Sequence, residues 1–261
     1  MWPSGVLSFC VSGFGVVVDE QGYDYRRSHI GRAEIYERVY SMGYERWQWD
    51  LVERPIVRSI LDGLRADGAR SLLDFACGTG RIAGEARELF PVVEGIDVAE
   101  DMLALARARY PDVRFEQIDI TRQPLERRFD VVAAFRFFMN AQPALRLEAL
   151  DAIREHLTPG GVLVANVHAN STSPLGIFHT IRAPIRHQAM PTAWSYRSFE
   201  RTLNERDFEI VRAWWHTYWP RAGDHFVGIA RSMLPKAEQF ARRAHLPRWL
   251  AQSFIVEARP R

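Results

Sequence analysis

Residues 74–80 combine an acidic side chain, a turn of small residues and the start of a helix. They read Asp-Phe-Ala-Cys-Gly-Thr-Gly and follow the apolar run 71–75. Small residues let a backbone approach a ligand closely and adopt conformations that a Cβ disfavours. Open parallel sheets bind their ligands at the carboxyl ends of the strands. The segment therefore predicts a ligand-binding loop between a buried strand and a helix.

The helix that follows this loop allows two kinds of ligand. Residues 78–83 match the G-x-G-x-x-A pattern of dinucleotide binding, in which a pyrophosphate lies on the amides of the helix N-terminus. Asp97 follows roughly twenty residues later and would bind ribose hydroxyls in either case. Asp74 would repel a pyrophosphate, whereas it would attract the cationic amino group of S-adenosylmethionine. The charge of Asp74 therefore favours S-adenosylmethionine.

Residues 74–80 resemble the first motif of class I (Rossmann-like) S-adenosylmethionine-dependent methyltransferases, usually written D/E-x-G-x-G-x-G. The sequence departs from it at the first glycine, where Ala76 stands. Because alanine is the smallest residue with a Cβ, we expect tighter packing there and retained binding. Later motifs of the family are resembled, in order, by residues 95–102, 115–120, 129–135 and 157–163.

The resemblance implies a site for S-adenosylmethionine and its product S-adenosylhomocysteine, without a metal. Asp97 would bind the ribose, Met102 would lie near the adenine, and Asp119 would bond the adenine amino group. Alternatively, Asp97 caps the following helix, Asp119 bonds to its own backbone in a turn, and Cys77 serves packing alone. The expected cofactor-binding residues are Asp74, Ala76, Cys77, Gly78, Gly80, Asp97, Val98, Met102, Asp119, Ile120 and Phe135.

Methyl transfer is an in-line displacement, so alignment of the acceptor matters most, and a hydroxyl acceptor benefits from a general base. His168 is the candidate catalytic base, because it follows a strand and shares a face with Asn166. Its alternative role is to bind backbone or order a lid. Arg136 could hold an anionic acceptor or pair with a lid carboxylate. The expected acceptor-binding residues are Arg136, Asn140, Tyr36, His29 and Trp194.

We therefore expect an S-adenosylmethionine-dependent methyltransferase that acts on a small molecule. O-methylation in a secondary-metabolite or glycan pathway is the specific hypothesis, and it rests on the variable segment after residue 167. Two alternatives stay open at this point: an NAD(P)-dependent oxidoreductase, and a cofactor-binding protein without catalysis.

Short apolar runs alternate with helical patterns, which predicts right-handed crossovers and a mostly parallel sheet with helices on both faces, a doubly wound α/β fold. The resemblance implies seven strands that end in an antiparallel hairpin. Pro235 should interrupt a helix at 226–244. Strands are expected at 71–75, 92–96, 113–118, 129–135, 162–167, 208–215 and 253–258, and helices at 81–90, 99–110, 144–156 and 198–205.

The chain is expected to form one domain at residues 22–261, after a disordered tail at 1–21. Within it we expect a helical cap, a cofactor-binding core, a lid or insertion and the second half of the sheet, at residues 22–66, 67–167, 168–197 and 198–261.

A net charge of +2 provides no general basic field for nucleic acid. Two cysteines fit a reducing compartment, so we expect a cytoplasmic protein. Residues 226–249 mix apolar and basic side chains and could lie on a membrane surface, although packing on the sheet is the favoured interpretation. The oligomeric state is left open.

Overall fold

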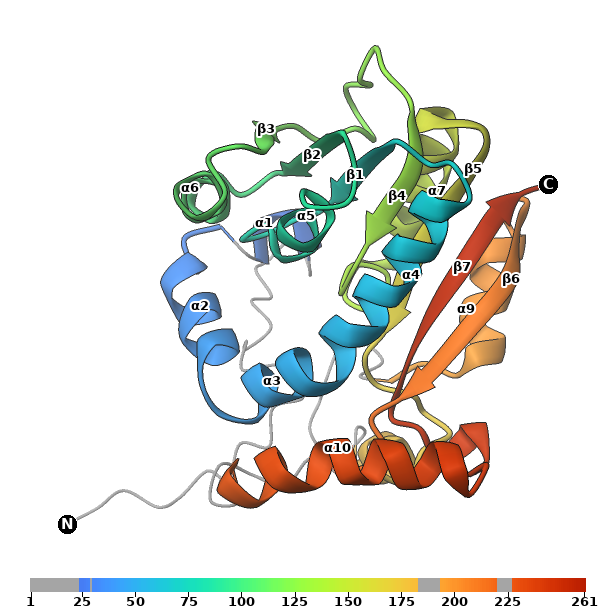
Figure 1. Ribbon diagram of the computed structural model, residues 1–261. Helices are drawn as coiled ribbons and strands as arrows, with labels where there is room; N and C mark the ends of the chain where they lie inside the picture. Colours follow the sequence, from blue (N-terminus) through green and yellow to red (C-terminus); the bar gives the residue numbers. More distant parts are fainter. Residues whose placement is uncertain (1–23, 29, 183–192, 220–226) are drawn as a thin grey trace.

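The computed structural model describes residues 24–28, 30–182, 193–219 and 227–261. In this part of the chain, seven strands form one sheet in the order β3-β2-β1-β4-β5-β7-β6 (Figure 1). The first five are parallel, and β7 pairs antiparallel with both β5 and β6. The expected fold class is confirmed. The strands are β1 (Ser71–Phe75), β2 (Val92–Asp97), β3 (Arg114–Gln117), β4 (Phe129–Ala134), β5 (Leu157–Val167), β6 (Phe208–His216) and β7 (Ser253–Pro260).

Helices cover both faces of the sheet because its central strands are apolar on both sides. Leu72 and Val131 pack toward α4 and α5, whereas Leu73 and Val132 pack toward α7 and α9. Helix α6 packs over β2 and β3. The helices of the two layers are α4 (Arg54–Ala66), α5 (Arg81–Ala86), α6 (Glu100–Arg109), α7 (Pro143–His156) and α9 (Tyr196–Asn204).

An N-terminal helical region, here called the cap, contacts the loops at the carboxyl ends of the strands. It comprises α1 (Tyr25–Ser28), α2 (Ala33–Ser41), α3 (Gly43–Gln48) and the π-helix η1 (Trp49–Glu53). Helix α2 packs on α6, and η1 runs directly into α4. The cap thus covers the edge at which the cofactor loop was expected.

The C-terminal helix differs from expectation in two ways. Helix α10 (Val227–Arg243) continues through Pro235, so the expected interruption is wrong. Pro235 is exposed, while its neighbour Leu234 is fully buried against Tyr44 and Val52, and this packing holds the helix together. Helix α10 also packs on α3 and η1, not on the sheet as favoured above.

The segment expected as a lid begins and ends close together. Asn170 and Trp194 form an isolated bridge, and α8 (Pro174–Arg182) follows the first of them. A short 3-10 helix, η4 (Arg248–Leu250), precedes β7. Among the described helices, none is both long and apolar enough to cross a membrane.

Two glycine substitutions test the packing of the sheet and its helices. A Cβ at Gly95 in β2 would lie 2.5 Å from the ring of Phe115, so Gly95→Ala should destabilise the protein by about 1–3 kcal/mol. Gly63 in α4 has no atom within 4 Å of such a Cβ. Gly63→Ala should therefore stabilise by about 0.5–1 kcal/mol through helix propensity. Urea unfolding measures both, and changes of the same sign would contradict this packing.

Candidate functional site

The loop between β1 and α5 bends back through left-handed backbone conformations. Ala76, Gly78 and Gly80 have φ angles of +53°, +54° and +75°. A Cβ at Gly80 would lie 2.8 Å from the ring of Phe115, whereas one at Gly78 would meet no atom within 4 Å. Gly80 is therefore required by packing, and the backbone at Gly78 is open to a ligand.

Ala76 adopts a conformation that glycine would adopt without strain. Left-handed backbone costs a residue with a Cβ about 1–2 kcal/mol. The departure from the family motif therefore carries a cost in backbone conformation, while Ala76 also packs against the core.

Asp74 lies beneath the loop and is 2% exposed. Its Oδ2 accepts a hydrogen bond of 2.9 Å from the backbone N–H of Ala83 in the first turn of α5. Burial, together with the nearby charge of Asp97, raises the pKa of Asp74 to about 7, although the α5 amides oppose this. The helix N-terminus, which attracts anions, is thus already bound to a carboxylate of the chain itself.

Asp97 joins the two loops that follow β1 and β2. Its Oδ2 accepts a hydrogen bond from the N–H of Gly78 at 2.8 Å, and its Oδ1 accepts one from the N–H of Ala99 at 2.9 Å. The second contact caps the start of α6, as the alternative interpretation proposed. The backbone N–H of Val98 also acts on this carboxylate. Because each carboxylate oxygen has two acceptor positions, capacity remains for a ribose hydroxyl.

Asp119 makes the turn that its alternative interpretation predicted. Its Oδ1 accepts hydrogen bonds from the backbone and hydroxyl of Thr121 at 3.0 and 2.6 Å. Its Oδ2 lies 2.6 Å from Nε of Arg26 on α1. Burial alone would raise the pKa of Asp119, but the hydrogen bonds from Thr121 and Arg26 hold it below its ordinary value. Arg26 also ties α1 to this loop.

Arg136 follows β4 and is surrounded by groups of the cap. Its guanidinium donates a hydrogen bond of 2.8 Å to the hydroxyl of Tyr40. It also lies 3.8 Å from a carboxylate oxygen of Glu45 and 3.5 Å from one of Glu53. Coulombic attraction from these groups raises the pKa of Arg136 despite its burial. Of the two roles considered, the structure thus supports pairing with carboxylates, which come from the cap and not from residues 168–197.

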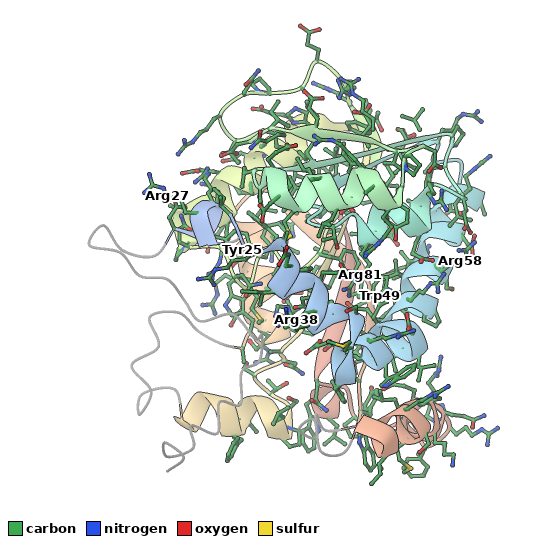
Figure 2. The ribbon with its side chains drawn as sticks, turned by 90° about the vertical axis from the view of Figure 1, so that its left-hand side faces the viewer. Tyr25, Arg27, Arg38, Trp49, Arg58 and Arg81 are labelled. Carbon is green, nitrogen blue, oxygen red and sulfur yellow. The ribbon has the colours of Figure 1, made fainter. Side chains whose placement is uncertain are left out.

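Several residues of this site were missed at the sequence level. Glu45 and Glu53 are buried, and Arg81 stacks on the rings of Tyr40 and Trp49, each at 4.8 Å (Figure 2 shows Arg81 next to Trp49). Charged residues in an amphipathic helix are usually exposed to solvent, so their residue types alone did not indicate that they are buried in this site. The π-helix shifts the helical register and turns Glu53 inward.

Known proteins resemble this chain over part of its length. The profile of the methyltransferase domain matches residues 72–161. The chain is 39% identical over 98 residues to the dTDP-3-amino-3,6-dideoxy-alpha-D-glucopyranose N,N-dimethyltransferase of Streptomyces fradiae, covering 37% of this chain and 38% of that one. It is 34% identical over 142 residues to the dTDP-3-amino-3,4,6-trideoxy-alpha-D-glucopyranose N,N-dimethyltransferase of Streptomyces venezuelae, covering 52% and 56%.

Residues 72–161 match the methyltransferase domain family, and both Streptomyces relatives are methyltransferases.

Solved structures share the fold of this chain over most of its length. The magnesium protoporphyrin IX methyltransferase of Synechocystis PCC 6803 superposes with a TM-score of 0.59 at 15% identity, over 87% of this chain and 93% of that one. The N-methyltransferase NodS of Bradyrhizobium japonicum WM9 gives 0.54 at 15%, over 85% and 90%. By contrast, the matched stretches span about half or less of the two Streptomyces relatives.

The remaining expected cofactor residues lie around the same loops. Cys77 is buried, and burial raises its pKa well above the ordinary value, which fits a packing role. Met102 is buried against Ala33 of the cap, and Ile120 is buried in the core below the third loop. Val98 follows β2 and Phe135 follows β4, and both are only partly buried.

The expected acceptor residues are brought together only in part. The ring of Tyr36 lies 4.3 Å from that of Tyr40, and Asn140 donates a hydrogen bond of 2.5 Å to the carbonyl oxygen of Arg136. Trp194 is instead buried in the core, where it contacts Phe199. His29 lies outside the described residues.

His168 is half-buried just after β5, and its carbonyl oxygen accepts a hydrogen bond from Ser253. Asn166, on the same face, accepts a hydrogen bond of 2.6 Å from the N–H of Arg136 and donates one of 2.8 Å to Glu53. Asn166 therefore positions the Arg136 cluster.

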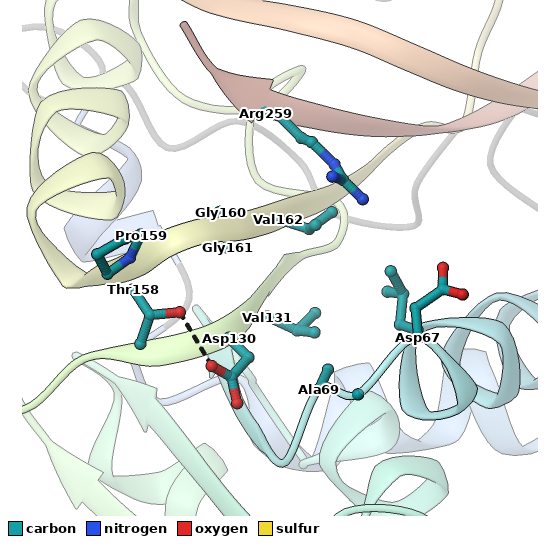
Figure 3. Close-up of a pocket in the computed structure, with 12 residues that line it drawn as sticks. Asp67, Ala69, Asp130, Val131, Thr158, Pro159, Gly160, Gly161, Val162 and Arg259 are labelled. Carbon is teal, nitrogen blue, oxygen red and sulfur yellow. Dashed lines mark hydrogen bonds between the residues drawn. The ribbon is translucent and has the colours of Figure 1, made fainter.

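A pocket at the opposite edge of the sheet is not part of this site. It is lined by the amino ends of β4 and neighbouring turns, including Thr158, Gly160 and Arg259 (Figure 3). Asp130 in its wall accepts hydrogen bonds from Arg70, Ser71 and Thr158. Ligands of open α/β sheets bind at the carboxyl ends, so we assign this pocket a structural role.

The raised pKa of Asp74 predicts a change of stability with pH. The pKa of Asp74 in the folded state lies above the ordinary value. The stability that Asp74 contributes to the folded state is therefore fully present below about pH 4 and is lost as the pH rises through about 7. Asp74→Asn keeps an acceptor for Ala83 but cannot ionise. Its stability relative to the unsubstituted protein should therefore improve by about 2 kcal/mol between about pH 5 and pH 8.

Urea unfolding at the two pH values measures this difference. Asp62→Asn, at an exposed position on α4, serves as the control and should show none. A relative stability of Asp74→Asn that stays constant or falls toward pH 8 would contradict the burial of an ionisable group here.

Proposed function

We propose that this chain is an S-adenosylmethionine-dependent methyltransferase with a small-molecule acceptor. The observation that carries the proposal is the hydrogen bond between Asp74 and the first turn of α5. It supplies a negative charge at the position where a dinucleotide would place its pyrophosphate. The NAD(P)-dependent alternative would require that carboxylate to leave the helix, so we set it aside.

The residues around the loop fit this cofactor. The open backbone at Gly78 allows close approach, Asp97 keeps acceptor positions for the ribose, and Asp74 provides a counter-charge for the cationic amino group. When bound, the cofactor supplies a methyl group activated by its sulfonium. We propose that four apolar residues surround the adenine: Val98, Met102, Ile120 and Phe135.

Asp119 has a narrower role in this proposal than the family resemblance implied. Thr121 occupies both acceptor positions of its Oδ1, Arg26 occupies one on Oδ2, and the exposed Arg122 lies 3.7 Å from Oδ2 without a hydrogen bond. One acceptor position is left for the adenine amino group. We propose that Asp119 both positions α1 through Arg26 and offers this remaining position to the adenine.

The acceptor is proposed on chemical grounds and on the relatives. Curated relatives include three amino-sugar N,N-dimethyltransferases and a malonyl-[acyl-carrier protein] O-methyltransferase of Bacillus cereus. We therefore widen the expected oxygen acceptor to a hydroxyl or amine of a small polar molecule. His168 is our proposed base, because it follows the carboxyl end of β5, two residues after Asn166, which binds Arg136. Methyl transfer from labelled cofactor to hydroxyl- and amine-bearing sugars tests this, and loss of transfer in His168→Ala is expected.

Cofactor binding should depend on Asp97. Calorimetry should detect binding of S-adenosylhomocysteine, and Asp97→Ala should weaken it by about 1–3 kcal/mol through lost hydrogen bonds. Asp62→Ala on the exposed face of α4 should leave affinity unchanged. NADH and NADPH should give no signal in a parallel fluorescence titration. Absence of binding at about millimolar S-adenosylhomocysteine, or a clear response to either nucleotide, would overturn the proposal.

Affinity should also rise with pH, because a bound cation favours the ionised form of Asp74. Below about pH 7 the dissociation constant of S-adenosylhomocysteine should fall by up to about tenfold per pH unit and then level off. Asp74→Asn should bind more weakly and lose this dependence. Calorimetry from about pH 5.5 to pH 8 checks it, and an unchanged dependence in Asp74→Asn would exclude Asp74 as its source.

A further inference from the structure

One long side of α10 is exposed and alternates between apolar and basic side chains. Ile229, Met233, Lys236, Phe240 and Arg243 recur at intervals of four and three residues, so they share one side of the helix. Ile229 is 53% exposed and Phe240 is 64% exposed. The buried side of α10 holds Leu234, Glu238 and Ala241.

Neighbouring elements extend this exposed surface. Helices α8 and α10 both lie at the base of the molecule in Figures 1 and 2. Ile177 and Phe178 on α8 are 46% and 49% exposed, and Trp249 on η4 is 52% exposed. Isolated exposed apolar residues are ordinary, but a concentration of large ones at one end of a molecule indicates an interaction surface.

The charge of this surface has one sign. Within α10 and η4, all five basic residues with described side chains are exposed, and these are Arg231, Lys236, Arg242, Arg243 and Arg248. The one acidic residue of these two helices, Glu238, is buried and accepts a hydrogen bond from the N–H of Tyr218. The described residues of α8 include no acidic side chain. Since the net charge of the whole chain is only +2, positive charge is concentrated at this end.

We propose that the surface formed by α10, α8 and η4 binds an anionic lipid bilayer, with α10 lying in the plane of the interface. Large aromatic and aliphatic side chains interleaved with arginine and lysine are what interfacial helices present to lipid headgroups and acyl chains. Negative headgroups complement the exposed basic residues. A second copy of the chain would instead bring two basic surfaces together, which like-charge repulsion opposes. The surface lies apart from the cofactor loop, so the proposal is independent of the methyltransferase assignment.

Co-sedimentation of the full-length protein with lipid vesicles tests the proposal. The protein should bind vesicles of phosphatidylcholine with about one-third phosphatidylglycerol, bind pure phosphatidylcholine at least about tenfold more weakly, and lose affinity as salt rises. Ile229→Ser/Phe240→Ser and Lys236→Glu/Arg243→Glu should each reduce binding by about tenfold or more. Val211→Ser, at a 46% exposed position on β6, is the matched control and should bind unchanged.

Circular dichroism and urea unfolding confirm that each variant is folded. Equal binding of the α10 variants and the unsubstituted protein would overturn the proposal, as would indifference to phosphatidylglycerol. A deletion of residues 1–18 locates the binding further, because loss of vesicle binding in that deletion alone would assign it to the apolar N-terminal segment. Sedimentation that shows a dimer dissociated by Phe240→Ser, without vesicle binding, would assign the surface to self-association.

Discussion

The site depends on a carboxylate at the N-terminus of α5. A helix that begins after a glycine-containing turn presents free amides and a positive dipole, which by themselves would bind an anion. In this chain Asp74 occupies that position from the preceding strand, with its pKa raised to about 7 by burial. The loop therefore presents negative charge to a ligand in place of an anion-binding site. The hydrogen bond from Gly78 to Asp97 then fixes the two loops that flank the ligand.

Two arginines attach the cap to the loops at the strand ends. Arg26 pairs with Asp119 after β3, and Arg136 after β4 pairs with Glu45 and Glu53 of the cap. Buried charges are tolerated only when they are paired, and removal of one partner leaves the other at a high cost. The position of the cap over the cofactor loop is therefore specified by charge as well as by apolar packing. This couples access to the site to a few ion pairs.

The sheet was predictable because its signals are local. Apolar runs and turns of glycine and proline indicated all seven strands and gave β1 to the residue, although β5 begins at Leu157 and not at residue 162 as predicted. The cofactor loop was equally local, since one short segment supplies it. The surroundings of Arg136, where the acceptor was expected, could not be predicted from local sequence. Glu45, Glu53 and Tyr40 contact Arg136 only through the tertiary fold. A π-helix shifts the helical register at Glu53, and Trp194, which was expected to bind the acceptor, packs in the core. The predicted interruption at Pro235 was wrong because the packing of Leu234 outweighs the local tendency of proline to break a helix.

Crystal structures grown with S-adenosylhomocysteine and, in parallel, with NADH would test the central claim most directly. The account predicts density for the first ligand only, with its ribose on Asp97, its amino group toward Asp74, and the bond from Ala83 to Asp74 retained. A pyrophosphate bound to the amides of Gly78 and Gly80, with the carboxylate of Asp74 displaced from α5, would contradict it.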